Sequence, residues 1–192
     1  MSAVRAANVT PLIRVNMRIA QMHLDVLSGG PFTFQTFDDG GAKRRDLVKV
    51  LHGTLAQHGE TLRRLNDAGA GVYITVNETD GKGRRKENVI RARANFIDLD
   101  GAAPTPALGW TLKPDLVIET SPGKFHIYGL ADETRAADLN GFTARQKKLA
   151  TLFSADPTCV DLPRVLRLAG FIHRKAKPYG VRIVPSDEWD LL

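Results

Sequence analysis

Cysteine is almost absent from this sequence, since Cys159 is the only one among 192 residues. A single cysteine excludes an intramolecular disulfide and any cysteine-rich zinc site within the chain. The N-terminal region contains no long apolar run, so we expect neither a signal peptide nor a membrane span, and we expect a cytoplasmic protein. The Gly-x4-Gly-Lys-Ser/Thr spacing of a Walker A loop is also missing, as are internal repeats and low-complexity segments.

The composition is that of a globular protein, with 43% hydrophobic and 25% charged residues. We expect a single domain over residues 1–192, with an N-terminal helical segment at 1–30 and a motif-bearing core at 71–175. The net charge of +6 and the sequence pI near 9.7 suit a polyanionic partner such as nucleic acid or nucleotide phosphates.

Hydrophobic spacing predicts a mixture of helices and strands. Helices are expected over residues 12–27, 46–55, 59–66 and 139–153. Strands are expected over residues 32–37, 71–77, 89–100, 116–119, 125–128 and 181–184, and the segment 165–172 is an apolar run interrupted by Gly170. Residues 38–41 read as a turn. The mixture predicts an α/β or α+β fold with a largely antiparallel central sheet.

The most informative segment is Asp98-Leu99-Asp100, at the end of the predicted strand over residues 89–100. A strand places alternate side chains on one face, so Ile97 and Leu99 point into a core while both aspartates point the other way. Adjacent carboxylates repel each other unless a cation lies between them, and hard cations such as Mg²⁺ take oxygen ligands. The alternative is an acidic turn at a strand end, because Asp-Gly is a common turn dipeptide.

The segment Ser121–His126 predicts a hairpin turn with a possible phosphate contact. Its glycine frees the turn to expose backbone N–H groups, and Lys124 is a point charge suited to phosphate. His126 lies on the polar face of the following strand, where it could hydrogen-bond a phosphate oxygen. The alternative is an ordinary hairpin with an incidental surface histidine.

The segment 155–161 follows the long predicted helix and contains a third candidate acid, Asp156. Asp156 could join the paired carboxylates, or Asp156-Pro157 could simply end the helix. Asp161 lies close behind as a second choice. Cys159 has no sequence-adjacent base, so we interpret it as small apolar filler rather than a nucleophile.

Basic residues gather in two further segments, 164–175 and 84–86. In the first, basic and apolar residues alternate through Arg167, which suits a strand with one cationic face. In the second, Arg84-Arg85-Lys86 reads as a charged hairpin tip. Phosphate or template binding is one interpretation of each, and a solvated basic surface is the other.

In chain order, segments 96–100, 121–126, 155–157 and 167–175 resemble the plasmid RepB-type primases of the archaeo-eukaryotic primase superfamily. That family carries paired acids, a Ser-x-His type element, and a hydrophobic residue followed by an acid. The Arg-Leu-x-Gly-Phe-x-x-Arg-Lys run marks its plasmid and phage branch. The resemblance spans about residues 71–175, and Ala169 stands where the family usually has proline.

The resemblance implies an α+β catalytic core in two α/β layers, with an RRM-like, largely antiparallel sheet flanked by helices. It implies an enzyme, a DNA primase or primase-polymerase, that makes primers or extends strands on single-stranded DNA by two-metal nucleotidyl transfer in plasmid or phage replication. The implied ligands of Mg²⁺ or Mn²⁺ are Asp98, Asp100 and Asp156. The implied contacts to the incoming NTP or dNTP are Ser121, Lys124, His126, Arg167 and Lys175. The implied contacts to the DNA template are Arg84, Arg85, Arg164 and Arg174.

Such primases often carry a following helical domain, so a helicase or a helical domain absent from residues 1–192 is an expected partner. Two rival functions stay open. A metal-dependent nuclease would use the same carboxylates, although the Ser121–His126 element argues for triphosphate instead. A non-catalytic binder of single-stranded nucleic acid would stack bases on Tyr73 and Tyr128, although paired acids would repel a phosphate backbone.

Overall fold

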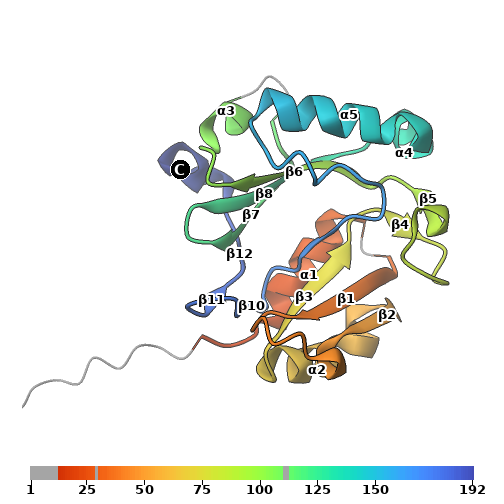
Figure 1. Cartoon of the computed structure of the whole chain (residues 1–192). Coiled ribbons are helices and arrows are strands. Elements are labelled where there is room, and N and C mark those ends of the chain that lie inside the picture. The colour runs from red at the N-terminus through yellow and green to blue at the C-terminus, as the bar shows by residue number, and fades with distance from the viewer. Residues whose placement is uncertain (1–12, 29, 110–112) are drawn as a thin grey trace, which may run out of the picture.

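The computed structural model describes residues 13–28, 30–109 and 113–192. Figure 1 shows their arrangement. In chain order the elements are α1 (Met17–Val26), β1 (Phe32–Asp38), η1 (Arg45–Leu47), β2 (Lys49–Gly53), α2 (Leu55–Asp67), β3 (Ala70–Thr75), β4 (Glu78–Thr79), η2 (Lys86–Asn88), β5 (Val89–Arg91), β6 (Ala94–Asp100), α3 (Thr105–Leu108), β7 (Leu116–Ser121), β8 (Lys124–Leu130), α4 (Glu133–Ala137), α5 (Leu139–Leu152), β9 (Val165–Arg167), β10 (Ile172–His173), β11 (Tyr179–Gly180), β12 (Arg182–Ile183) and η3 (Ser186–Leu191).

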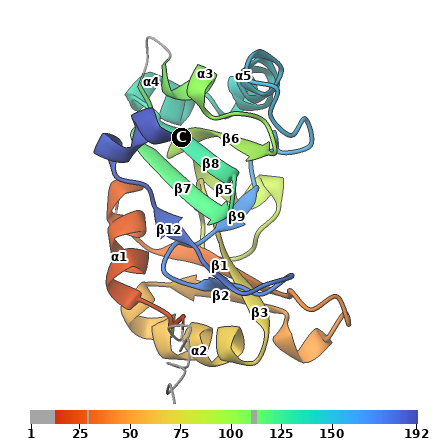
Figure 2. The ribbon, with the colours of Figure 1, turned by 90° about the vertical axis from the view of Figure 1, so that its left-hand side faces the viewer.

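The strands form two four-stranded sheets rather than the one central sheet predicted from the sequence. The first has the order β2-β1-β3-β9 and the second the order β12-β7-β8-β6, with smaller pairs β10-β11 and β4-β5. Every strand pairing in the described part of the chain is antiparallel, as predicted. Helices α3, α4 and α5 lie over the second sheet and α2 lies with the first, while α1 runs alongside β12 (Figures 1 and 2).

Both faces of the second sheet are buried. Phe96 and Tyr128 belong to a core shared with the first sheet. Ile97 and Leu99, on the opposite face, pack in a second core that includes residues of α3 and α5. The sequence correctly predicts the buried face of Ile97 and Leu99. The face of β6 that carries Asp98 is also buried at Phe96. The acids therefore lie at the end of a strand that is buried on both faces, and not on a solvent-exposed face of the sheet.

The predicted helix over residues 46–55 is wrong. This stretch forms η1 and then β2, which pairs with β1 in register from Thr36 opposite Lys49 to Phe32 opposite Gly53. The β-branched residues Val48 and Val50 favour extended backbone here. Helix α2 begins only at Leu55, where Thr54 and Gln57 form a capping box.

The predicted continuous strand over residues 89–100 is interrupted. The backbone N–H of Arg93 donates to Asn77 Oδ1 at 3.0 Å, and the Arg93 guanidinium lies 4.2 Å from the centre of the Phe32 ring. Ala92 N–H donates to the carbonyl of Ala136. These contacts divide the strand into β5 and β6, and they direct β6 into the second sheet.

Helix α5 fixes the outer strand β6. The amide of Gln146 donates to the Phe96 carbonyl at 2.7 Å and accepts from the Phe96 N–H at 3.2 Å, so the side chain satisfies the open edge of β6. The predicted long helix and the predicted hairpin over residues 116–128 are confirmed as α5, β7 and β8. Helix α1 begins at Met17, capped by Asn16, and the predicted start at Leu12 lies outside the described residues.

Within the described ranges, no helix is long and apolar enough to cross a membrane.

Candidate functional site

Strands β6 and β8 bring the first two sequence motifs side by side. Asp98 is directly opposite His126, and Asp100 is directly opposite Lys124. The His126 Nε2 atom lies 3.7 Å from Asp98 Oδ1, and the Lys124 ammonium forms an ion pair with the Asp100 carboxylate. The predicted hairpin therefore places one basic nitrogen beside each of the paired acids.

The loop after α5 brings Asp156 to the same strand end. Its backbone N–H donates to the Asp98 carbonyl at 2.9 Å. The Asp156 carboxylate accepts from the N–H and the hydroxyl of Thr158, both at 2.8 Å. Asp161, the other candidate, is instead bonded to Arg164 Nε at 2.7 Å. The structure thus places Asp156, rather than Asp161, beside the paired acids.

The electrostatics of this acid group are unfavourable for Asp98. Burial, followed by the charges of Asp156 and Asp100, raises the pKa of Asp98 to about 6 from its ordinary 3.8, while Arg164 and Lys124 oppose the rise. In the described part of the chain, no three His, Cys, Asp or Glu side chains converge as a ready-made metal cage. The three aspartates are therefore neighbours with an excess of negative charge, and only side-chain rotation would bring their oxygens to one point.

His126 is buried and neutral. Its side chain is 5% exposed, and burial lowers its pKa to about 3, with Arg167 as a further cause. Its Nδ1 atom is buried and has no hydrogen-bond partner among the described residues. The neutral imidazole thus directs Nε2 toward Asp98 and keeps a buried Nδ1 whose hydrogen-bonding capacity the described residues do not use.

The turn between β7 and β8 differs in one respect from the prediction. Gly123 has a φ of +75°, which explains the glycine. Its N–H is not free, because it donates to Glu119 Oε1 at 3.3 Å. Glu119 in turn is held by the Tyr179 hydroxyl and Arg182. Ser121 and Lys124 flank the turn and remain reachable from solvent.

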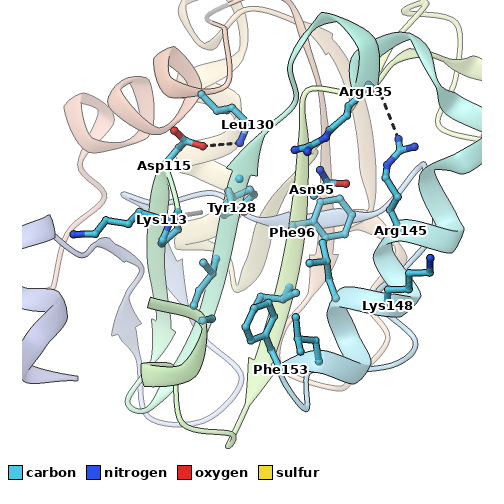
Figure 3. A pocket seen from close by; sticks show the side chains of 17 residues that line it. Asn95, Phe96, Lys113, Asp115, Tyr128, Leu130, Arg135, Arg145, Lys148 and Phe153 are labelled. Carbon is cyan, nitrogen blue, oxygen red and sulfur yellow. Dashed lines mark hydrogen bonds between the residues drawn. The ribbon is translucent and has the colours of Figure 1, made fainter. Parts of the chain in front are cut away.

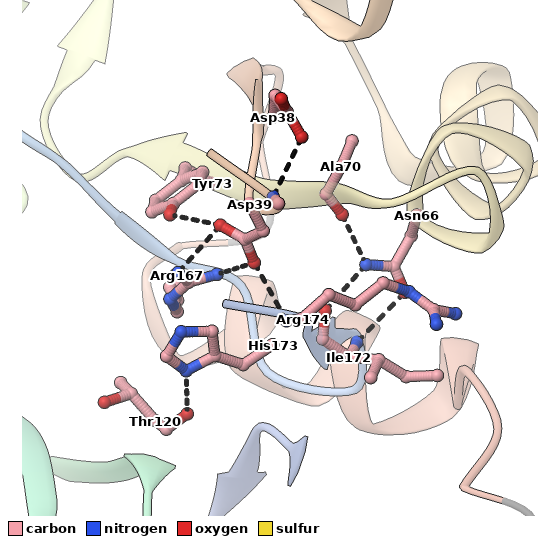
Figure 4. Close-up of polar contacts among 11 residues, drawn as sticks. Asp38, Asp39, Asn66, Ala70, Tyr73, Thr120, Arg167, Ile172, His173 and Arg174 are labelled. Carbon is pink, nitrogen blue, oxygen red and sulfur yellow. Dashed lines mark hydrogen bonds and ion pairs between the residues drawn. The ribbon is translucent and has the colours of Figure 1, made fainter. Parts of the chain in front are cut away.

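The alternation of basic and apolar residues predicted that Arg167 lies on an exposed cationic face, and this prediction is wrong. Arg167 is 8% exposed and donates two hydrogen bonds of 2.9 Å to the carboxylate of Asp39, which lies 128 residues earlier (Figure 4). The sequence pattern indicates only a turn at Asp39. The adjacent acids Asp38 and Asp39 at a strand end could have indicated a functional position. No local pattern, however, identifies Arg167 as the partner of Asp39.

The other basic residues are more exposed, with mixed partners. Arg84 donates to the Pro163 carbonyl at 3.4 Å, so the 84–86 segment lies against the start of the 164–175 segment. The side chain of Arg85 is 86% exposed. Arg164 pairs with Asp161 at 2.5 Å, and Arg174 lies 3.5 Å from Asp67. Lys175 is exposed. Arg84 and Arg164 therefore approach one another, which the sequence could not show.

Two further side chains are excluded from chemistry. Tyr128 is fully buried, so it cannot stack a base, and that part of the rival interpretation is wrong. Cys159 is buried, and burial raises the pKa of its thiol to about 12. A thiol that stays protonated at neutral pH is a poor nucleophile, in agreement with its interpretation as filler.

A cavity of about 760 Å³ lies on the other side of the second sheet (Figure 3). Ile97, Ile127 and Leu149 line it together with Arg145 and Lys148. Ile97 and Ile127 point away from the face that carries Asp98 and His126, because neighbouring residues in a strand alternate between faces. The cavity is therefore separate from the acid group.

Comparison with known proteins identifies the family. Residues 62–187 match the family described as the RepB DNA-primase N-terminal domain. Mobilization protein A of Escherichia coli is 32% identical over 121 residues, which make up 63% of this chain and 16% of that protein. The chain thus spans about one sixth of the length of that curated relative.

Solved structures share the fold. The primase-polymerase domain of cyanophage S-2L superimposes with a TM-score of 0.71 at 22% identity, covering 90% of this chain and 91% of that one. The catalytic domain of primase RepB′, solved with initiator DNA, gives a TM-score of 0.66 at 24% identity, covering 88% and 84%. These likenesses confirm the predicted catalytic-core fold of the archaeo-eukaryotic primases. With about two thirds of its length matched by the family model, the chain belongs to the RepB DNA-primase family.

Proposed function

We propose that this domain is a template-dependent nucleotidyltransferase that makes primers or extends strands on single-stranded DNA. The observation that carries the proposal is the gathering of Asp98, Asp100 and Asp156 at one strand end, with His126 and Lys124 across the same hairpin. Membership of the RepB-type primase family supports the reaction class.

The acid group fits a divalent cation. Its donors are carboxylate oxygens, which Mg²⁺ and Mn²⁺ prefer. Burial first, and then the charges of Asp156 and Asp100, raise the pKa of Asp98, and a bound cation would offset both effects. Asp98, Asp100 and Asp156 would therefore hold Mg²⁺ or Mn²⁺, and two such ions would activate the attacking 3′-hydroxyl and neutralise the phosphates of the incoming nucleotide.

The chain's own basic groups would orient the incoming nucleoside triphosphate. Lys124 now pairs with Asp100, and a cation on Asp100 would free the ammonium for a phosphate. His126 would add a hydrogen bond from its neutral ring, and Ser121 would add its hydroxyl beside them. Arg167 and Lys175, which lie in the basic segment 164–175, would contribute positive charge.

The template would run over the exposed cations. Arg84, Arg85, Arg164 and Arg174 are the proposed contacts, and their binding should weaken as salt concentration rises. The matched residues make up 16% of mobilization protein A. We therefore propose that a helicase or a helical domain, in a longer protein or an assembly, acts together with this domain.

A primer-extension assay tests the proposal. The chain is incubated with a primed single-stranded DNA, Mn²⁺ and labelled nucleotides, and the products are separated by length. We expect lengthened primers, and we expect none from Asp100→Asn, whose thermal unfolding should match that of the natural chain. Shortened strands would identify a nuclease instead, and full synthesis by Asp100→Asn would refute the assignment of the acids.

The role of His126 is tested by His126→Ala. A hydrogen bond to a charged phosphate contributes roughly 1.5–3 kcal/mol, so the KM for the nucleotide should rise about tenfold to a hundredfold. The affinity for template DNA should stay unchanged. An equal loss of both, or of neither, would contradict a role in triphosphate binding.

A further inference from the structure

Asp39 is the most heavily bonded carboxylate between the two sheets (Figure 4), yet it belongs to none of the four sequence motifs. It is 7% exposed and follows directly after β1. Besides the two bonds from Arg167, it accepts from the Tyr73 hydroxyl at 3.2 Å and from the backbone N–H of Arg174 at 3.0 Å. Four donors from three separate strands or loops therefore converge on one carboxylate.

The contact of Asp39 with Arg167 is geometrically restricted. The two guanidinium bonds are parallel and equal in length, and the guanidinium lies 4.7 Å from the centre of the Tyr73 ring. A Cβ atom on Gly71 would lie 2.5 Å from Asp39 Oδ1 and 2.8 Å from Arg167 Nη1, so the pair rests on bare backbone. A bidentate pair that is enclosed in this way fixes the direction of the guanidinium as well as its charge.

Stability alone does not account for such a pair. Buried ion pairs often contribute little net stability, because removing both charges from water opposes their attraction. A role in placing Arg167 accounts for the same geometry directly. Among the described residues, both hydrogen bonds of Arg167 go to Asp39, so its remaining N–H groups are not used by the protein.

The surroundings connect Arg167 to the candidate nucleotide site. His173 lies beside Arg167 in Figure 4, and the next residue, Arg174, donates its backbone N–H to the same Asp39 carboxylate that Arg167 holds. His173 bonds the carbonyl of Thr120, the residue before Ser121, at 2.9 Å. Asp39 also holds the Arg174 amide at the start of the Arg174-Lys175 pair. One carboxylate thus anchors a guanidinium and the backbone of a basic loop, in which His173 contacts β7 while the Arg174 side chain turns toward Asp67.

We propose that Asp39 is a positioning residue of the nucleotide site, which holds Arg167 and the backbone of Arg174 in the arrangement that receives the triphosphate. Asp39 itself touches no substrate and acts through Arg167. The inference rests on the proposed nucleotidyl transfer and adds to it a residue outside the motifs.

The test compares Asp39→Asn with Asp38→Asn in the primer-extension assay. Both substitutions remove one negative charge at neighbouring positions. The Asp38 carboxylate accepts from the backbone amides of its own turn, including those of Gly40 and Arg44, so it is the neighbouring control. Asparagine at position 39 keeps the shape but cannot accept both guanidinium bonds. We expect Asp39→Asn to raise the nucleotide KM about tenfold or more, which corresponds to about 1.4 kcal/mol, with kcat and template affinity within about twofold. Asp38→Asn should leave all three unchanged.

A purely structural role gives a different pattern. If Asp39→Asn lowers the unfolding temperature but its KM equals that of Asp38→Asn, the proposal is overturned. If Asp39→Asn does not fold, Arg167→Lys and Tyr73→Phe replace it. The lysine keeps the charge without the fork and should raise KM about tenfold, and the phenylalanine should raise it about twofold to fivefold. Wild-type KM values for both variants would overturn the proposal.

A double substitution shows whether Asp39 acts through Arg167. If it does, Asp39→Asn combined with Arg167→Lys should have a KM close to that of the worse single variant. Multiplied effects would overturn the proposal. His126→Ala in the same assay separates the two levels of inference. If it leaves KM unchanged, the proposed function fails; if it raises KM while Asp39→Asn does not, only the role of Asp39 fails.

Discussion

Replacing Asp98 by asparagine should stabilise the cation-free protein while abolishing nucleotidyl transfer. Burial and the charges of Asp156 and Asp100 raise the pKa of Asp98 from 3.8 to about 6. Each pKa unit corresponds to about 1.4 kcal/mol, so the ionised side chain destabilises the fold by at most about 3 kcal/mol at neutral pH. The side chain is 29% exposed, and solvent screening reduces the expected gain to about 1–2 kcal/mol.

The assay is thermal unfolding at pH 7.5 with a chelator present. For a chain of this size, each kcal/mol changes the unfolding temperature by about 2–4 °C, so Asp98→Asn should unfold about 2–8 °C higher than the natural chain. Asp161→Asn is the matched control, and it should bring no gain because Asp161 pairs with Arg164. Adding Mn²⁺ should then raise the unfolding temperature of the natural chain, and it should raise that of the Asp98→Asn variant much less.

The pH dependence gives the same test a second readout. The folded protein binds a proton at Asp98 near pH 6, whereas the unfolded chain does so only near pH 3.8. The destabilisation is therefore complete above about pH 6, decreases as the pH falls from 6 to 3.8, and is absent below. The advantage of Asp98→Asn should narrow over that range. An Asp98→Asn variant less stable than the natural chain at pH 7.5 would refute the reasoning.

Three other outcomes follow from the same contacts. Gln146→Leu leaves the N–H and carbonyl of Phe96 unpaired in the core, so denaturant unfolding should show a loss of about 2–4 kcal/mol. In primer extension, Asp156→Asn should be inactive and Asp161→Asn active, and the reverse would exchange their roles. In Gly71→Ala the added Cβ atom would overlap with the Asp39–Arg167 pair, so the KM for the nucleotide should rise as in Asp39→Asn. An unchanged KM would contradict the close packing of Gly71 against this pair.

Local patterns predicted the hairpin and the acids well. The alternation around Asp98 and the glycine of the β7-β8 turn are short-range signals, and the structure places both as expected. Once β6 and β8 pair, the register alone puts His126 opposite Asp98. The prediction that Asp98, Asp100 and Asp156 hold metal is not tested by this geometry and stays a prediction.

Non-local contacts account for what the sequence missed. Strand β2 forms because β1 supplies a partner, so a helical spacing over residues 46–55 was misleading. The break at Ala92-Arg93 depends on Asn77 and Phe32, which no local pattern identifies. Asp39 and Arg167 are 128 residues apart, and each alone resembles an ordinary surface charge.

Two groups of charges lie between the sheets, and they are compensated to different degrees. This difference affects how cations and a nucleotide would bind. Asp39 compensates Arg167 with two hydrogen bonds, whereas Lys124 and Arg164 only partly offset the acids around Asp98. Negative charge therefore gathers where the cations would bind, whereas the charge of Arg167 is compensated by Asp39. Under the proposed function, the acids would repel an approaching triphosphate unless their charge is neutralised, and Lys124, now paired with Asp100, would become available for a phosphate once a cation is held there. The proposed metal ligands and the proposed nucleotide contacts would then act as one coupled unit.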